Sequence, residues 1–335
     1  MDEMLISLAI ILIKCGVLIF ILLTGFAYMT WLERKVLGRM QTRYGPNRVG
    51  PFGLLQPMAD GIKLFFKEDI QPSEIDKPVY LLAPALSATL ALIAFAVIPV
   101  GPPIQLLGRT IEFYIADVNI AVLYLLAISS LAVYSTVLAG WASNSKYPFL
   151  GGIRSSAQMI SYELPMGIAI VGVLLLVGSL KLVDIVNAQS RLWFVVLQPL
   201  GFILYIVCAI AEVNRAPFDL PEAETELVAG YHTEYSGLKF AMFYIAEYTN
   251  IIAVSVIAVT LFLGGYQVPF LPPSPIWFLG KLFIFLFMFI WLRATLPRLR
   301  YDRLMNLSWK VLLPLSLANL MVTAILIVVK DLYFS

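Results

Sequence analysis

The sequence predicts an all-α, polytopic integral membrane protein with about eight transmembrane helices plus an interfacial amphipathic helix, and three observations support this. Hydrophobic residues make up 60% of the 335 residues and charged residues only 13%, whereas soluble domains usually carry about 25% charged residues. The apolar residues gather in stretches of the roughly 20 residues that a helix needs to cross a bilayer. The first stretch is too long for a signal-peptide core and no basic residue precedes it, so we expect it to be retained.

Eight apolar segments are predicted to span the membrane. In chain order they are 5–30, 79–101, 116–140, 157–178, 192–211, 238–264, 276–294 and 309–330. No soluble domain is expected, so residues 1–335 are predicted to form a single transmembrane domain.

The connections between the spans differ in charge, and this difference predicts the orientation. Most basic residues lie in the connections 31–78, 141–156, 212–237 and 295–308. Loops rich in Lys and Arg stay on the cytoplasmic side. With an even number of spans, both termini are then expected outside.

One segment of the long connection 31–78 is predicted to lie in the membrane interface. Apolar residues recur at helical spacing from Leu55 to Phe66, while Asp60, Lys63 and Lys67 fall on the other face. This pattern is typical of an amphipathic interfacial helix. Such a helix is either a surface anchor or one wall of an apolar cavity at the membrane edge.

A cluster of acidic residues lies between two apolar stretches. Its seven members fall within 36 residues and are Glu212, Asp219, Glu222, Glu224, Glu226, Glu234 and Glu247. Ionised carboxylates at membrane depth are costly and normally mark proton or ion pathways. Neighbouring acids in a low dielectric titrate as a coupled set, which suits reversible loading and release of protons. A solvated acidic loop is the alternative, and helix capping is a second explanation for Asp219 and Glu222.

Several ionisable residues are predicted inside or at the ends of spans. Glu247 lies about nine residues into its span, roughly 13 Å from the nearer end. Glu163 is either a proton-relay residue or a first-turn acid that the helix dipole favours, and Glu212 ends its helix, where the dipole disfavours an anion. Snorkelling explains Lys281, while Lys14 is deeper and is expected to have a buried partner.

Composition excludes several classes of site. The net charge of +2 gives no reason to expect nucleic acid as a partner. His232 is the only histidine, and Cys15 and Cys208 are the only cysteines, so the chain lacks the ligands of a bis-histidine haem, a multi-histidine zinc site or an ordinary iron–sulfur cluster. We therefore expect no metal and no bound cofactor in this chain.

Three stretches on the predicted cytoplasmic side carry a family resemblance. The first is LERK at 32–35, QTRYGPNRVGP at 41–51, QP at 56–57 and KED at 67–69; the second is GWASNSKY at 140–147 with Arg154 and SYE at 161–163; the third is PFDLPEAE at 217–224 with ELVAGYHTEY at 226–235. With these stretches the chain resembles the membrane-embedded H subunit of respiratory complex I, the proton-pumping NADH–quinone oxidoreductase, over nearly its whole length.

The resemblance implies one subunit of a multi-subunit translocase with no catalytic residue of its own. The subunit would form much of the quinone entrance chamber, with quinone as substrate and with NAD, FMN and iron–sulfur clusters in partner subunits. The implied partners are the peripheral-arm quinone-site subunits, adjacent small membrane subunits and the lipid bilayer. The implied location is the bacterial cytoplasmic (inner) membrane, or the mitochondrial inner membrane for an organellar chain.

The resemblance also implies two sets of site residues. The quinone path maps to Glu33, Arg34, Arg43, Asp60, Lys63 and Phe218. The acidic proton relay maps to Glu163, Glu212, Asp219, Glu222, Glu224, Glu226 and Glu247, and less firmly to Glu234. Without the resemblance, Arg34 and Arg43 are better explained as positive-inside anchors.

The expected function is coupling of quinone reduction to proton pumping, with the proline-broken segment 214–222 as the element that has two arrangements. A membrane subunit of a related energy-converting hydrogenase is one alternative, against which the nearly intact loop 43–51 argues. A stand-alone ion or solute carrier and a scaffold that only anchors the peripheral arm are the others.

Overall fold

The computed structural model describes residues 2–106, 109–219 and 229–334. Its longer helices are α1 (Asp2–Met40), α2 (Gln56–Phe66), α3 (Lys77–Ile93), α4 (Ala121–Ala142), α5 (Lys146–Val177), α8 (Pro199–Glu212), α10 (Gly237–Phe262), α11 (Pro275–Thr295) and α13 (Leu313–Phe334). Three shorter α-helices are α6 (Leu182–Ala188), α7 (Phe194–Leu197) and α12 (Tyr301–Leu307). One antiparallel hairpin joins β1 (Ile104–Leu106) to β2 (Arg109–Ile111). The predicted all-α polytopic fold is confirmed.

Within the described residues, seven helices are long and apolar enough to cross a membrane. The predicted span 192–211 is not one continuous helix in the structure. α7 ends at Leu197 and α8 begins at Pro199, so α8 is only 14 residues long. Proline is favoured at the start of a helix, because the N–H groups of the first turn have no partner within the helix and proline therefore loses no hydrogen bond there. The chain is an integral membrane protein with one shorter apolar helix beside these seven.

Two helices extend well past their predicted ends. α1 continues to Met40 through polar residues that form helices readily, and Thr42 just after it has a left-handed φ of 55°. α5 begins at Lys146 rather than near 157. Hydropathy marks the part of a helix that lies in lipid, and the helix itself continues beyond the bilayer.

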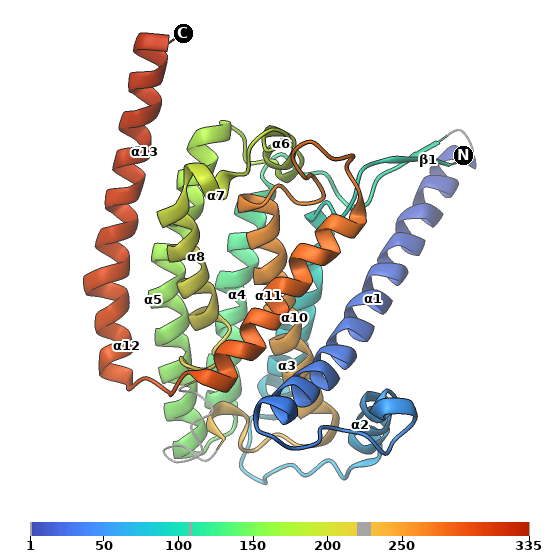
Figure 1. Ribbon diagram of the computed structural model, residues 1–335. Helices are drawn as coiled ribbons and strands as arrows, with labels where there is room; N and C mark the ends of the chain where they lie inside the picture. Colours follow the sequence, from blue (N-terminus) through green and yellow to red (C-terminus); the bar gives the residue numbers. More distant parts are fainter. Residues whose placement is uncertain (1, 107–108, 220–228, 335) are drawn as a thin grey trace.

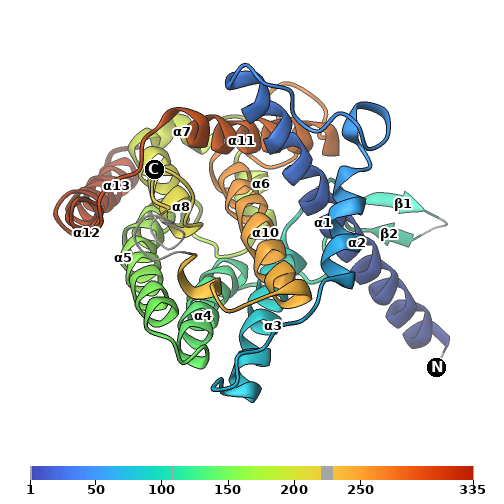
Figure 2. The same ribbon diagram turned by 90° about the horizontal axis from the view of Figure 1, so that it is seen from below.

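The helices surround α10, the most enclosed spanning helix. Seen from below, α3, α4, α8 and α11 stand around α10, while α1 leans across one side and α13 packs on α5 at the other (Figure 2). Both termini lie on the side of the hairpin, and α2 lies on the opposite side (Figure 1). We refer to these as the hairpin side and the α2 side.

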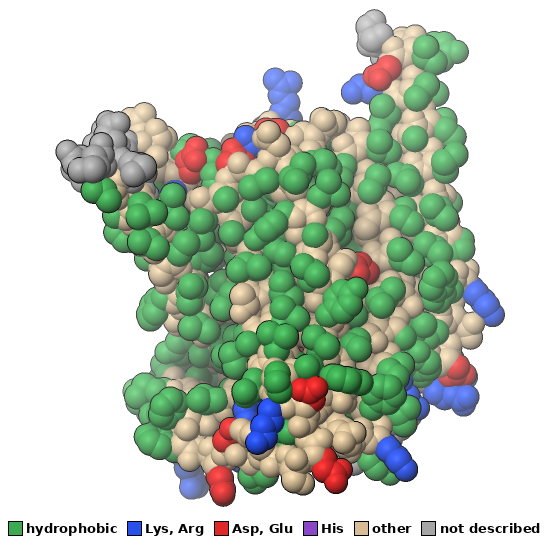
Figure 3. Space-filling view, turned by 180° about the vertical axis from the view of Figure 1, so that it is seen from behind, with side chains coloured by type: hydrophobic (Ala, Val, Ile, Leu, Met, Phe, Trp, Pro, Cys, Tyr) green, Lys and Arg blue, Asp and Glu red, His purple; other side chains and the backbone are tan. Residues whose placement is uncertain are grey.

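The surface shows how the protein sits in a bilayer. Hydrophobic side chains cover the middle of the molecule and charged side chains gather toward its two ends (Figure 3). The predicted amphipathic helix is α2, and Met58, Ile62, Phe65 and Phe66 on it are 50–80% exposed. These side chains form an apolar face on α2 that no described part of the chain covers.

Candidate functional site

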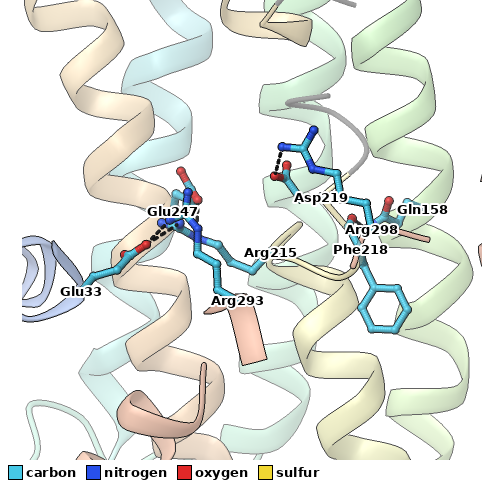
Figure 4. A network of polar contacts seen from close by, with 8 residues as sticks. All are labelled: Glu33, Gln158, Arg215, Phe218, Asp219, Glu247, Arg293 and Arg298. Atoms are coloured by element: carbon cyan, nitrogen blue, oxygen red, sulfur yellow. Dashed lines mark hydrogen bonds and ion pairs between the residues drawn. The ribbon is translucent and has the colours of Figure 1, made fainter. Parts of the chain in front are cut away.

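Four charged side chains from separate parts of the chain meet in one buried network (Figure 4). Arg215, in the connection after α8, lies with its Nε 2.6 Å from Oε1 of Glu247 on α10. Its Nη1 lies 3.4 Å from Oε1 of Glu33 on α1. Arg293, in the last turn of α11, donates to the same Glu33 oxygen. We call these four residues the charge network.

The charge network is balanced, with two carboxylates and two guanidinium groups. Glu33 is only 4% exposed and Arg215 5%, and an isolated charge at such a depth is strongly destabilising. The Arg215 guanidinium also lies over the ring of Tyr248, 4.4 Å from its centre, in a favourable cation–π contact. Burial lowers the pKa of Arg215, but the negative charges of Glu247 and Glu33 outweigh this effect and raise that pKa well above its ordinary value. Arg215 therefore stays charged between Glu33 and Glu247.

Asp219 and Phe218 lie in a second buried group beside the charge network (Figure 4). Asp219 is 6% exposed and accepts from Nη2 of Arg298 at 3.0 Å. The Nε2 of Gln158 donates to the Phe218 carbonyl at 2.8 Å. The Phe218 ring is buried and packs 5.7 Å from the ring of Tyr162. Phe218 thus lies in the core between helices.

Glu163 and Glu212 form a third acidic position within the bundle. The hydroxyl of Ser129 donates to Glu163 Oε1 at 3.0 Å, and the hydroxyl of Ser130 donates to the same oxygen. Glu212 is the last residue of α8. Its Oε2 is buried and has no hydrogen-bond partner among the residues that the structure describes. Ser129, which donates to Glu163, lines one cavity together with Glu212.

A polar cavity brings Glu212 and Glu247 together. Both acids line it, together with Asn214, Asn250 and Ser135. A cavity lined by several hydrogen-bonding groups suits ordered water. Water there would connect the charge network, through Glu247, to Glu212.

The residues predicted for the quinone path fall into separate places. Arg34 pairs with Asp60 on α2 at 2.6 Å, and Lys63 lies 3.7 Å from the same carboxylate. The amide of Gln56 also donates to Asp60, at 3.2 Å. Arg43 instead donates to the neighbouring Gln41 side chain. The structure thus brings Arg34, Asp60 and Lys63 together at the contact between α1 and α2.

Glu33 connects the two predicted sets of residues. It was assigned to the quinone path, but its side chain points into the charge network, where Arg215 joins it to the relay residue Glu247. Its neighbour on α1, Arg34, pairs with α2. Two consecutive residues of α1 therefore make different contacts: Arg34 contacts α2, and Glu33 contacts the charge network.

Three predicted relay residues, Glu222, Glu224 and Glu226, lie outside the described residues. Glu234 is partly buried, and its backbone carbonyl accepts from the Tyr80 hydroxyl at 2.6 Å.

The two lysines inside spans are held by backbone carbonyls. Lys281 is buried: it is 9% exposed and its ammonium lies 4.7 Å from the ring centre of Trp193. That ammonium donates, at 2.5 to 2.9 Å, to the carbonyls of Leu263, Gly265 and Gln267. Lys14 donates to the carbonyl of Tyr114 at 3.2 Å. Both side chains thus contact the hairpin-side connections.

Sequence reasoning missed several partners of the acids. Arg298 was counted only among the basic residues of the connection 295–308, and Arg293, Ser129 and Ser130 were not considered. An arginine in the last turn of an apolar span is the one local signal that pointed to Arg293. The described residues contain no group of three His, Cys, Asp or Glu side chains placed to hold a metal ion.

Comparison with known proteins identifies the family. A family model described as NADH dehydrogenase matches residues 13–324. The chain belongs to the NADH dehydrogenase family. Among relatives in this family, the NADH-quinone oxidoreductase H-1 subunit of Geobacter metallireducens is 53% identical over 98% of this chain and 100% of its own. The NADH-quinone oxidoreductase H subunit of Thermomicrobium roseum is 56% identical over 92% of this chain and 93% of its own. The resemblance to the H subunit is confirmed.

Proposed function

We propose that this chain, as the H subunit of a proton-translocating NADH–quinone oxidoreductase, borders the entrance path of the quinone and links quinone reduction to buried acids. Electrons would come through NAD, FMN and iron–sulfur clusters in partner subunits, with quinone as the substrate reduced beside this chain. The α2 side would face the cytoplasm and both termini the outside of the bacterial inner membrane. The observation that carries the proposal is the buried contact of Arg215 with both Glu33 and Glu247.

The region between α1 and α2 has the two properties that a quinone requires. A quinone needs an apolar corridor for its tail and polar groups near its head. The exposed face of α2 supplies apolar side chains such as Phe65 and Phe66. The group formed by Arg34, Asp60 and Lys63 supplies charge at the same contact.

The charge network offers a physical route from quinone chemistry to the acids. Reduction of a quinone to a quinol consumes two electrons and two protons, so negative charge arises beside this chain before the protons arrive. Negative charge near α1 draws the Arg215 guanidinium toward Glu33 and away from Glu247, which it contacts at 2.6 Å. A buried carboxylate that loses its cation binds a proton instead. Glu247 would then take a proton from the polar cavity and return it when Arg215 moves back.

The relay continues from Glu247 to Glu212 and Glu163. Glu247 and Glu212 line the same polar cavity. Glu163 accepts from Ser129, which lines a second cavity together with Glu212. The proposed relay therefore needs no residue of the segment 220–228. The hydrogenase and stand-alone carrier alternatives gain no support from the relatives, which are named as subunits of NADH-quinone oxidoreductases.

The test replaces each relay acid in the assembled complex and measures turnover together with proton pumping. Glu247→Gln and Glu212→Gln remove the proton-binding group and keep the shape of the side chain. We expect assembly to persist while pumping-coupled turnover falls in both variants. Glu74→Gln, at an exposed position, is the matched control and should behave as wild type. Normal turnover and pumping in both relay variants would remove the relay from the proposal.

A further inference from the structure

An apolar cavity extends from the buried acids toward the hairpin side. At its inner end it is lined by Glu212, Asn250 and Ser129, and at its outer end by Val122, Leu182 and Leu261. Asn250 and Leu261 both belong to α10, so the cavity reaches over roughly 16 Å at the rise of an α-helix. This is about half the thickness of a bilayer core.

The inner end of the cavity meets the proposed relay. Glu212 and Asn250 line both this apolar cavity and the polar cavity that holds Glu247. The buried Oε2 of Glu212, which lacks a hydrogen-bond partner among the described residues, therefore lies where the polar and the apolar cavity meet. The proposed relay uses only the polar cavity and not the apolar cavity that Glu212 also lines.

The short helix α6 lies at the outer end of the cavity, where its Leu182 is part of the lining. Leu182, Ile185 and Val186 of α6 are 0–1% exposed, and the N–H of Val122 donates to the carbonyl just before α6, that of Leu180, at 3.2 Å. Beyond α6 the surface is charged. Lys181 pairs there with Asp117 at 2.5 Å and Ser179 with Asp184 at 2.7 Å.

The lining of the cavity decides its state of hydration. Apolar cavities in proteins stay dry because a water inside them finds too few hydrogen-bond partners. Between its ends this cavity is lined by side chains such as Leu125, Ile170 and Val254. A dry stretch blocks ions and protons, and channels use such constrictions as gates.

Building on the proposed relay, we propose that this cavity is a hydrophobic seal on an outward proton route, with Glu212 as the inner proton-binding group and α6 as the outer closure. When water enters the cavity, the Glu212 carboxyl transfers its proton to that water and becomes a carboxylate. The polar cavity then supplies the next proton to Glu212. While the cavity is dry, the acids exchange protons only with the inner side, and the gradient that the complex builds is kept.

The test makes the seal polar. The double variant Leu125→Asn/Ile170→Asn replaces two lining side chains on α4 and α5 by polar ones of similar or smaller size. In the assembled complex in liposomes, without NADH, an imposed pH gradient should decay about tenfold faster than in wild type, which corresponds to a barrier lower by about 1.4 kcal/mol. Adding Glu212→Gln should return the decay to the wild-type rate.

The control is Leu204→Asn, because Leu204 is 1% exposed in α8 but does not line the cavity. It should show no leak. A leak that persists with Glu212→Gln, an equal leak in Leu204→Asn, or no leak in the double variant would each overturn the seal. These outcomes are separate from the pumping test, since the passive leak requires no quinone reduction.

A milder variant covers the case in which the double variant does not assemble. Leu125→Cys, made in a Cys15→Ser background, places a thiol in the cavity. Cys208, the other thiol, is buried. We expect the new thiol to remain unlabelled by a small water-soluble maleimide from either side of the membrane. Labelling from the hairpin side would overturn the seal.

Discussion

Replacing Arg215 by Met tests the charge network most severely. The substitution removes the one cation seen to contact both Glu33 and Glu247 in the described residues and keeps the unbranched, apolar part of the side chain. Arg293 still pairs with Glu33 in the variant, so the loss falls mainly on Glu247. Without Arg215, we expect Glu247 either to bind a proton or to destabilise the folded protein as a buried charge.

The expected loss of folding stability in Arg215→Met follows from the burial of Arg215 and Glu247. The side chains of Arg215 and Glu247 are 7% and 14% exposed, and removing one partner of a buried ion pair costs about 3–5 kcal/mol. Because Glu33 keeps Arg293, we expect the lower end, about 3 kcal/mol. The double variant Arg215→Met/Glu247→Gln should recover a substantial part of this loss, since it also removes the charge of the carboxylate that Arg215 contacted.

Thermal unfolding of the purified, assembled complex measures these differences. The control is Arg300→Met, which breaks an ion pair whose side chains are 79% and 53% exposed, and such pairs contribute about 0–1 kcal/mol. We expect Arg215→Met to lower the unfolding temperature far more than this control does. Equal shifts in the two variants, or a double variant less stable than Arg215→Met alone, would refute the description of a buried, balanced network.

Two further predictions concern the α2 side. Lys239 donates to Asp69 at 2.8 Å, and this hydrogen bond lowers the pKa of Asp69 below its ordinary 3.8. The ionised Asp69 therefore stabilises the folded protein fully above pH 3.8. This contribution is lost as the pH falls through the lowered pKa. The difference in unfolding temperature between wild type and Asp69→Asn, measured from pH 7 downward, should be small because the carboxylate is half-exposed. This difference should shrink only below about pH 4. A difference that already changes near neutral pH would contradict this prediction. Phe66→Asp, at a position 80% exposed, should leave assembly intact and raise the KM for long-tailed quinones more than for short-tailed ones, and unchanged kinetics with both would exclude the α2 face from the quinone path.

Much of the fold could be predicted because hydropathy and charge act locally. The apolar stretches became helices, and the amphipathic pattern from Leu55 to Phe66 became α2. The ends of α1 and α5 could not be found in this way, because polar residues continue a helix beyond the bilayer as readily as apolar ones do. The break at Gln198 was missed because the residues around it are apolar, although Pro199 signals it.

The site could be predicted only in part, because its residues meet through tertiary packing. Glu33 and Glu247 were each singled out, and Arg215 belongs to the proline-broken segment 214–222. The sequence separation of 182 residues between Glu33 and Arg215, however, gives no local sign of a contact. The assignment of Glu33 to one set and of Glu247 to another therefore hid the connection between them. Lys281 illustrates the same limit, since its carbonyl partners come from the turn after α10.

Infrared difference spectroscopy of the assembled complex, recorded on quinone reduction, tests the central claim most directly. The claim is that Glu247 exchanges its Arg215 ion pair for a proton when the quinone is reduced. It predicts a protonated-carboxyl band that appears on reduction in wild type and is absent in Glu247→Gln. An identical band in both proteins, or no carboxyl band in wild type, would contradict it.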